Sequence, residues 1–351
     1  MNPQLLFCPN LECDARGVSG AGNIRVHQAE EGRYRCRRCG KTFSERKGTI
    51  FHRLQTKPEV VMYVVVLLAY GCPPQAAAKA FGVDERTVRS WWKRAGEHCE
   101  VFHQQMVGQS KLDLQHVQAD EMKVKARGGY YWMAMALMVS TRLWLGGAVS
   151  AQRNEQLIVQ LVRQIHAVAL CRPLLLAVDG LNSYVTVFGK FFRAGLPRFG
   201  RTGRRQLVPW PDVAIVQLIK KRKKRDFQLR RRIVQGTAAT VEQLICATQG
   251  RPGSINTAYI ERLNASFRQR LSPLTRRSRS LAVRADTLHH GMFIVGCFYN
   301  FCDHHRSLRC KLWLTERRFR WIHRTPAMAA QLTSRTWSHS QIFWSRLPLH
   351  V

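Results

Sequence analysis

The sequence predicts an α/β protein whose main domain contains a mixed β-sheet and follows two small N-terminal modules. Three observations predict this: two close pairs of cysteines in the first forty residues, a basic pair of helices after them, and strand-like alternation from residue 114. A chain of 351 residues can hold one large domain and one or two modules. The expected segments are 1–52, 53–108, 109–312 and a basic tail at 313–351.

The composition is unusually basic and predicts a polyanionic partner. The chain has 56 Lys and Arg against 22 Asp and Glu, a formal net charge of +34. Such a chain repels itself unless a polyanion neutralises it, so we expect it to bind nucleic acid. No secretory signal is recognisable, and the longest apolar run, 60–70, is shorter than the ~20 residues of a membrane span. We therefore expect a cytoplasmic protein with no membrane partner.

Four N-terminal cysteines have the spacing of a zinc site. They follow the pattern C-x4-C, a 22-residue gap and C-x2-C, and the second pair lies in the run YRCRRCGKTF. Thiolates on two tight turns can surround a Zn²⁺ ion tetrahedrally, whereas unconnected cysteines have no reason to occur in close pairs. We expect a zinc ribbon in residues 1–52. Its predicted ligands are Cys8, Cys13, Cys36 and Cys39.

The next segment has the pattern of a helix-turn-helix. An apolar helix at 58–70 precedes a run of small residues, a turn at 82–84 and a helix at 85–95, for which Asp84 is a natural N-cap. An ordinary helical hairpin with a solvated basic face is the alternative, but the basic ribbon upstream favours DNA binding. The second helix is expected to bury Val88, Trp91 and Trp92. The residues expected to face a major groove are Arg86, Arg89, Lys93 and Arg94.

From residue 114 the pattern is that of consecutive strands. The segments LQHVQADEMKVK, YYWMAMALMVS and RLWLGGAVSA indicate three antiparallel strands. A helix is expected at 154–168, and LLLAVDG indicates a short buried strand that ends in a turn. Three antiparallel strands, a helix and a further buried strand are the opening of a ribonuclease H-like mixed sheet.

A strongly basic stretch follows. Residues 193–210 are rich in Gly, Arg and Pro and predict a loop, and 212–220 predicts a strand that continues into KKRKKR. Between 201 and 235 there are 12 basic and 2 acidic residues, a density that repels itself without a counter-anion. We expect a basic loop that follows the phosphate backbone of DNA. The residues predicted to do so are Lys220, Lys221, Arg222, Lys223, Lys224 and Arg225.

Two acids stand out because they lie in apolar strands, where an unpaired carboxylate is costly. Asp120 belongs to the first strand, and Asp179 ends the later buried strand, where a turn or capping role is the alternative. Alternation puts Gln118 and Asp120 on one face and Glu121 on the other, so Asp120 is expected to be the inward acid. If the two strands are parallel neighbours, both aspartates reach the same end of the sheet, where they can share a metal ion.

Several motifs resemble those of a known family. ADEM, AVDGLNSY and NTAYIERLNASFRQRL resemble, in order and wording, the acidic motifs of the InsAB-type bacterial insertion-sequence transposases of the DDE superfamily. YNFCDHHRSL and RTPAMAAQLT are similar to tail motifs of related transposases. The resemblance spans roughly residues 8–333 and implies a triad of Asp120, Asp179 and Glu261 that binds Mg²⁺ or Mn²⁺. It selects Glu261 over the rival Glu242, although the 81 residues between Asp179 and Glu261 are more than the smallest members hold.

The resemblance also implies a function. The chain is expected to be a DNA transposase that binds the terminal inverted repeats of its insertion sequence and catalyses metal-dependent strand cleavage and strand transfer. Its expected partner is double-stranded DNA, at the element ends and at the target site. It is also expected to form a homo-oligomer on DNA and to associate with the bacterial nucleoid. On the helix that carries Glu261, Asn264 and Arg268 fall at i+3 and i+7 and are expected to contact DNA.

Two other classes of protein remain open. One is a non-catalytic zinc-ribbon and helix-turn-helix regulator, or an inactive transposase relic. The other is a basic RNA-binding protein, which would explain the charge but not the acids in apolar strands. Cys302 and His305 have helical spacing, but a core cysteine and a surface histidine are favoured over metal ligands. The last eighteen residues match none of the family's motifs.

Overall fold

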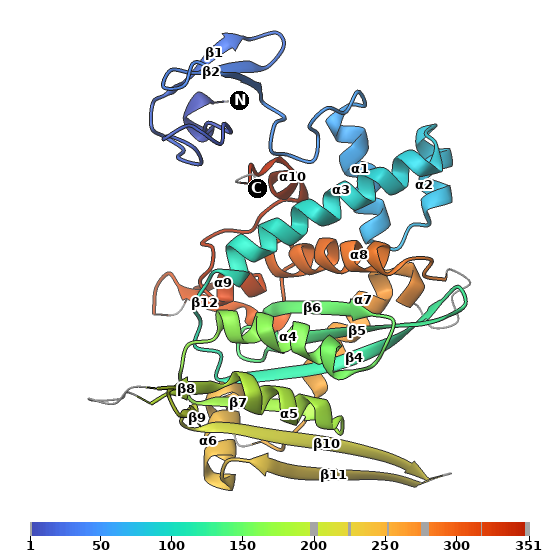
Figure 1. Cartoon of the computed structure of the whole chain (residues 1–351), viewed down its shortest axis with the longest axis vertical. Coiled ribbons are helices and arrows are strands. Elements are labelled where there is room, and N and C mark those ends of the chain that lie inside the picture. The colour runs from blue at the N-terminus through green and yellow to red at the C-terminus, as the bar shows by residue number, and fades with distance from the viewer. Residues whose placement is uncertain are drawn as a thin grey trace. The chain divides into compact units, whose positions relative to one another are not determined.

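The chain forms two compact units in a computed structural model (Figure 1). The structure describes residues 2–196, 203–223, 226–250, 253–274, 281–316 and 318–347. The first unit contains residues 1–102 and 337–351, and the second contains residues 103–336. Within the described ranges, every helix is too short or too polar to cross a membrane.

The first unit combines an antiparallel three-stranded sheet, in the order β1-β2-β3, with four α-helices and one short 3-10 helix in its described part. Its elements are η1 (Pro3–Leu5), β1 (Ile24–Gln28), β2 (Arg33–Cys36), β3 (Thr42–Ser44), α1 (Pro58–Ala69), α2 (Pro74–Phe81), α3 (Glu85–His103, whose last residue begins the second unit) and α10 (His339–Trp344).

The predicted pair of helices is present, and its turn is closed as the sequence indicates. Gly82 takes the left-handed conformation that ends α2, with φ of 62°. The carboxylate of Asp84 then accepts a hydrogen bond of 2.6 Å from the backbone N–H of Arg86, at the start of α3. The burial of Val88, Trp91 and Trp92 is confirmed. The expected end of this helix at residue 95 is wrong, because buried Ala95, Cys99 and Phe102 continue its apolar stripe.

The final segment of the chain, which matches no family motif, completes the core of the first unit. Ser338 and Gln341 form a capping box that starts α10. Ile342 and Phe343 are fully buried, and the imidazole of His98 on α3 bonds to the carbonyl of Ile342 at 2.9 Å. The stretch expected to be one basic tail is therefore divided, since residues 313–336 belong to the second unit and 337–351 to the first.

We expect Phe343→Ala to destabilise the first unit by about 3–5 kcal/mol, because it removes a fully buried aromatic ring and leaves a cavity. Urea titration of the full chain measures this change in the free energy of unfolding. Tyr63→Ala on α1, where the side chain is 54% exposed, is the control and should change stability much less. Equal effects of the two substitutions would contradict a core role for the C-terminal segment.

The second unit contains a six-stranded mixed sheet in the order β11-β10-β7-β4-β5-β6, which Figure 1 shows side by side. β4, β7 and β10 are parallel to one another, whereas β5, β6 and β11 pair antiparallel with their neighbours. The strands are β4 (His116–Ala126), β5 (Gly129–Met138), β6 (Trp144–Ser150), β7 (Leu174–Asp179), β8 (Arg193–Gly195), β9 (Leu207–Pro209), β10 (Val213–Lys223), β11 (Asp226–Gln235), β12 (Cys310–Trp313) and β13 (Phe319–Ile322). The helices are η2 (Gln104–Gly108), α4 (Glu155–Val168), α5 (Asn182–Phe191), α6 (Ala238–Gln249), α7 (Ala258–Arg270), η3 (Ser272–Leu274), α8 (Ala285–Cys297), η4 (Phe298–Cys302), η5 (Arg306–Leu308) and α9 (Pro326–Ala329).

Helices cover both faces of this sheet. On β6, Gly146 faces Gln164 of α4, whereas its neighbour Gly147 faces Met292 of α8. On β4, Glu121 bonds to Tyr184 of α5, whereas the preceding Asp120 bonds to a residue of α7. Successive residues of one strand point to opposite faces, so α4 and α5 lie on one face and α7 and α8 on the other. The predicted mixed α/β architecture is confirmed.

Gly296 on α8 allows this helix to approach the sheet closely. A Cβ atom at Gly296 would lie 2.1 Å from the fully buried ring of Trp144. We expect Gly296→Ala to destabilise the second unit by about 1–3 kcal/mol through overpacking. Gly189→Ala on α5 is the matched control, because nothing lies within 4 Å of its added Cβ and alanine favours a helix. Thermal unfolding of both variants measures the difference, and a stable Gly296→Ala protein would refute the packing.

The basic stretch is not the loop that was expected. Residues 213–223 form β10, which pairs with β7, and 226–235 form β11 at the edge of the sheet. β8 and β9 form a small hairpin within 193–210, of which 197–202 lie outside the described residues. The prediction failed because residues 228–233 of the edge strand β11 are all exposed, so this strand does not need an apolar alternation.

Candidate functional site

The four N-terminal cysteines form a group that could bind zinc. The Sγ atoms of Cys8, Cys13, Cys36 and Cys39 all lie within 4.8 Å of one another. The Sγ of Cys8 is 3.5 Å from that of Cys39, and Cys13 and Cys36 are separated by 3.9 Å. Zn–S bonds of ~2.3 Å in a tetrahedron require sulfur atoms about 3.8 Å apart, so the spacing fits the ion.

The surroundings of this group favour thiolate at one position. Burial opposes ionisation of Cys36, but the backbone N–H groups of Cys39 and Arg38 and the Asn23 amide outweigh it and lower its pKa to about 7. The Asn23 amide nitrogen lies 3.3 Å from the Cys36 Sγ atom. The core around the cysteines is small, with Leu6, Ile24, Tyr34 and Phe43 as its largest buried members.

A second group of possible ligands lies at the sheet of the second unit. Carboxylate oxygens of Asp120, Glu121 and Asp179 lie within 4.8 Å of one another, an arrangement that could bind a divalent metal ion. The parallel register pairs Gln118 of β4 with Ala177 of β7, so the aspartates two residues further along reach the same end of the sheet. The two strands are therefore parallel neighbours, which is the condition under which the sequence placed both aspartates at one end of the sheet.

Glu121 belongs to this group although strand alternation excludes it from the Asp120 face. Its side chain is almost fully buried and accepts hydrogen bonds from Tyr184, at 3.0 Å, and from Arg153, at 2.6 Å from Nε. The same guanidinium lies 3.2 Å from Asp179. The sequence could have indicated Glu121 as a site residue, because it is the neighbour of Asp120 in an apolar strand. It could not have indicated the partners Arg153 and Tyr184, which are distant in sequence.

The acidic group of Asp120, Glu121 and Asp179 has more carboxylates than cations around it. Burial, followed by the charges of Glu121 and Asp179, raises the pKa of Asp120 to about 7. Burial and Asp179 likewise raise the pKa of Glu121, against the effect of Arg153. A divalent cation would relieve this repulsion, so the donor set fits a hard metal ion with oxygen ligands.

Glu261 lies near this group but is paired with a lysine. It occupies the first turn of α7, and its carboxylate accepts hydrogen bonds from Lys220 of β10 and, at 2.6 Å, from the Thr257 hydroxyl. Burial would raise the pKa of Glu261, but Lys220 and Thr257 outweigh it and lower the pKa. Its charge contributes to the raised pKa of Asp120. The rival Glu242 is exposed on α6 and is not in the acidic group.

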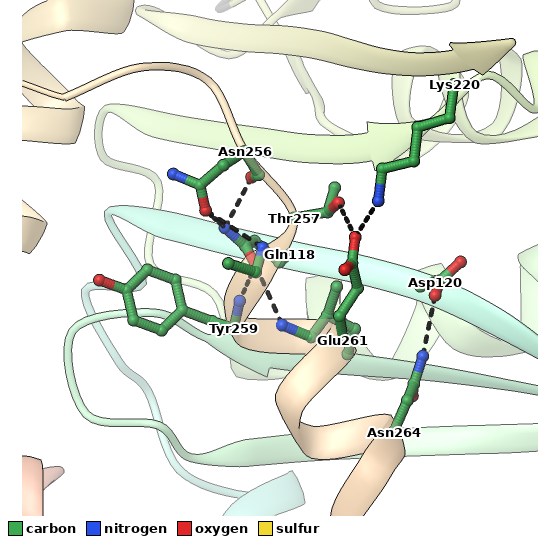
Figure 2. Close-up of polar contacts among 10 residues, drawn as sticks. Gln118, Asp120, Lys220, Asn256, Thr257, Tyr259, Glu261 and Asn264 are labelled. Atoms are coloured by element: carbon green, nitrogen blue, oxygen red, sulfur yellow. Dashed lines mark hydrogen bonds and ion pairs between the residues drawn. The ribbon is translucent and has the colours of Figure 1, made fainter. Parts of the chain in front are cut away.

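Gln118 attaches α7 to the sheet, a role that the sequence did not reveal. Its side-chain oxygen accepts the backbone N–H groups of Tyr259 and Ile260, each at 3.0 Å, and its amide nitrogen donates to the Asn256 carbonyl at 2.8 Å (Figure 2). The first N–H groups of a helix have no partner within it, so a buried glutamine here replaces an N-cap. This contact fixes the helix turn that carries Glu261.

Asn264 was predicted to contact DNA, but its side chain is buried in the structure. It is 1% exposed, and its amide nitrogen donates to Asp120 at 2.8 Å. Figure 2 shows Glu261 directed toward Lys220 and Asn264 toward Asp120. The two residues do share a stripe of α7, but that stripe faces the acidic group of the sheet. Arg268, the next member of the stripe, is half-buried.

The basic residues predicted to read DNA on α3 differ in their surroundings. Arg86, Arg89 and Lys93 are exposed, and Arg89 pairs with Glu85 at 2.5 Å. Arg94 is half-buried and donates to the backbone carbonyl of His52 at 2.5 Å, so its expected outward position is wrong. It joins α3 to the segment after β3, a contact between residues too distant in sequence to predict.

Fewer residues of the basic stretch 220–225 are open candidates for DNA contact than the sequence predicted. Lys220 is engaged with Glu261. Lys221, Arg222 and Lys223 continue β10 as backbone, whereas Lys224 and Arg225 lie outside the described residues. Exposed Arg230, Arg231 and Arg232 on β11 were not predicted individually and form a basic edge of the sheet.

Comparison with protein-family models and with curated protein sequences finds no match. The site is therefore interpreted from its own residues and their arrangement.

Proposed function

We propose that this chain is a DNA transposase of the DDE superfamily with a ribonuclease H-like catalytic unit. The observation that carries the proposal is that Asp120 on β4 and Asp179 at the end of β7 lie in one acidic group with Glu121. Glu261, on the helix that Gln118 anchors, is near enough for its charge to raise the pKa of Asp120. The strand sequence of three antiparallel strands, a helix and a parallel fourth strand supports the ribonuclease H-like assignment.

Asp120 and Asp179 would hold Mg²⁺ or Mn²⁺, with Glu261 as the third ligand of the family triad. A metal ion held there would supply activation of the attacking oxygen and stabilisation of the leaving oxygen of a phosphodiester. Asn264 orients the Asp120 carboxylate, and Gln118 fixes the turn of α7 on which Glu261 lies. Lys220 holds Glu261 ionised through its positive charge.

The first unit would supply recognition of the element ends. A cysteine group that can bind zinc and a helix pair with exposed Arg86, Arg89 and Lys93 on α3 are the features that support this role. The formal net charge of +34 supports binding to a polyanion. We propose double-stranded DNA as the partner, at the element ends and the target.

One observation favours a non-catalytic regulator as the second candidate. Arg153 pairs with Glu121 and Asp179, and Lys220 pairs with Glu261, so cations of the chain already lie on the carboxylates. If these ion pairs are permanent, the chain binds DNA without cutting it. Metal binding at the acidic group separates the two candidates.

The test uses the full chain and duplexes that contain the DNA on either side of its gene. Under the transposase proposal, Mg²⁺ or Mn²⁺ produces strand breaks at the outer ends of inverted repeats, and EDTA abolishes them. Binding to these duplexes without cleavage in either metal would favour the regulator. Absence of both binding and cleavage would overturn the two candidates.

A further inference from the structure

The second unit contains an arginine-lined pocket that the proposed function does not use. Its volume is about 500 Å³, within the range of pockets that hold small organic ligands. It lies between α7 and the motif YNFCDHHRSL, whose role the sequence left open. The lining includes Arg142, Tyr259, Arg262, Arg270, Tyr299 and Arg306.

α7 presents a different stripe to this pocket than to the acidic group. Tyr259, Arg262, Ser266 and Arg270 occupy positions i, i+3, i+7 and i+11 and all line the pocket. Glu261 and Asn264 form the stripe that faces Lys220 and Asp120. One helix therefore has an anion-rich neighbourhood on one side and a cation-rich neighbourhood on another.

The pocket carries an excess of positive charge. Four arginines line it against one acid, Asp303, which pairs with Arg270 at 2.7 Å. Arg142, Arg262 and Arg306 are left to attract an anion. Burial lowers the pKa of His305 to about 4, so this histidine is neutral near pH 7 and adds a hydrogen-bonding group without charge. The expectation of a surface histidine is wrong, since His305 is half-buried.

Arg142 indicates what kind of ligand fits. It lies in the turn between β5 and β6, and its guanidinium stacks on Tyr259, 4.0 Å from the ring centroid. Its Nη1 atom is buried and has no hydrogen-bond partner among the described residues. An unsatisfied buried guanidinium N–H is costly, so an acceptor group is expected to complete it. Phosphate oxygens match the planar fork of arginine.

We propose that this pocket binds the terminal phosphate group of a nucleotide. The arginines provide charge and donors for a dianion, and the exposed Ser307 provides a hydroxyl donor. Tyr259, which is half-buried, provides aromatic surface for the attached nucleoside, and the volume exceeds what a phosphate alone needs. The source is either the 5′ end of a nucleic acid strand or a free nucleotide. This inference does not depend on metal-dependent cleavage.

The experiment compares 5′-phosphorylated and 5′-hydroxyl forms of one short single-stranded oligonucleotide, and adenosine 5′-monophosphate with adenosine. Affinity is measured for the full chain at constant ionic strength. We expect the phosphorylated form of at least one pair to bind about tenfold more tightly, as charge-assisted hydrogen bonds to a phosphate would produce. Preference in the oligonucleotide pair identifies a strand end, and preference only in the nucleoside pair identifies a free nucleotide.

The pocket variant is Arg262→Ala combined with Arg306→Ala, both exposed arginines whose removal leaves the core intact. It should abolish the preference for the phosphorylated form. The charge-matched control is Arg163→Ala with Arg193→Ala, two exposed arginines outside the pocket, which should retain the preference. Absence of any preference in the unaltered chain, its persistence in the pocket variant, or its equal loss in the control would overturn the proposal. Asp120→Asn should keep the preference, which separates failure of this inference from failure of the cleavage proposal.

Discussion

Replacing Asp120 or Asp179 by asparagine should reduce metal-dependent DNA cleavage by at least roughly a thousandfold. Each substitution removes the negative charge of a proposed metal ligand while keeping the shape of the side chain, so folding should be unaffected. DNA binding should remain within about twofold, because ligand loss does not touch the basic residues of the first unit. Gel assays of cleavage and binding with the same duplexes measure both effects.

Comparison of Glu261→Gln with Glu121→Gln in the same cleavage assay identifies the third proposed metal ligand. Glu261→Gln should abolish cleavage if the family triad holds. If instead Glu121→Gln abolishes it and Glu261→Gln does not, Glu121 is the third ligand, as its place in the acidic group allows. Glu242→Gln, at an exposed position on α6, is the control and should cleave normally. Full activity of the Asp120 variant would rule out the acidic group as the active site.

Removal of zinc should unfold the segment around β1, β2 and β3. Structural zinc contributes about 10–16 kcal/mol of apparent binding free energy in small cysteine-ligated domains. Few large apolar side chains are buried beside the cysteines, so the apolar core of this segment cannot replace the metal. We expect one zinc ion per chain by elemental analysis, and rapid proteolysis within residues 8–44 once a chelator has removed it.

Cys36→Ser should lose the zinc ion and give the same proteolysis pattern without chelator. Cys171→Ser is the control, because Cys171 is exposed and lies in the second unit. It should keep one zinc ion and remain resistant. A metal-free chain that still resists proteolysis in this segment would show that the cysteine group is not a structural zinc site.

Local patterns were sufficient to predict much of the second unit. The alternating segments became β4, β5 and β6, and the order of elements around Asp120 and Asp179 followed from apolar periodicity. Parallel pairing of β4 and β7 then brings these two aspartates to one end of the sheet by geometry alone. The cysteine spacing was similarly local, because each close pair occupies one turn of backbone.

The partners of the acids were not predictable, because they depend on contacts between distant segments. Asn264 and Lys220 were expected to contact DNA from their charge or polarity, yet each bonds to a carboxylate of the site. Arg153 gave no sequence signal, although it pairs with two acids of the group. A basic residue in a basic chain has two possible anions, the nucleic acid and the chain's own acids, and sequence composition does not distinguish them.

The return of residues 337–351 to the first unit determines the order in which the chain can fold. The second unit is inserted within the first, so its 234 residues separate residues 1–102 from residues 337–351. During synthesis the ribosome releases the cysteine segment and α1 to α3 long before Ile342 and Phe343 exist. The second unit can therefore become compact while the first still lacks part of its core, a reversal of the usual N-terminal-first order. Ribosome-bound chains that end before residue 337 should expose the apolar surface of α1 and α3 to chaperones until residues 337–347 have been synthesised.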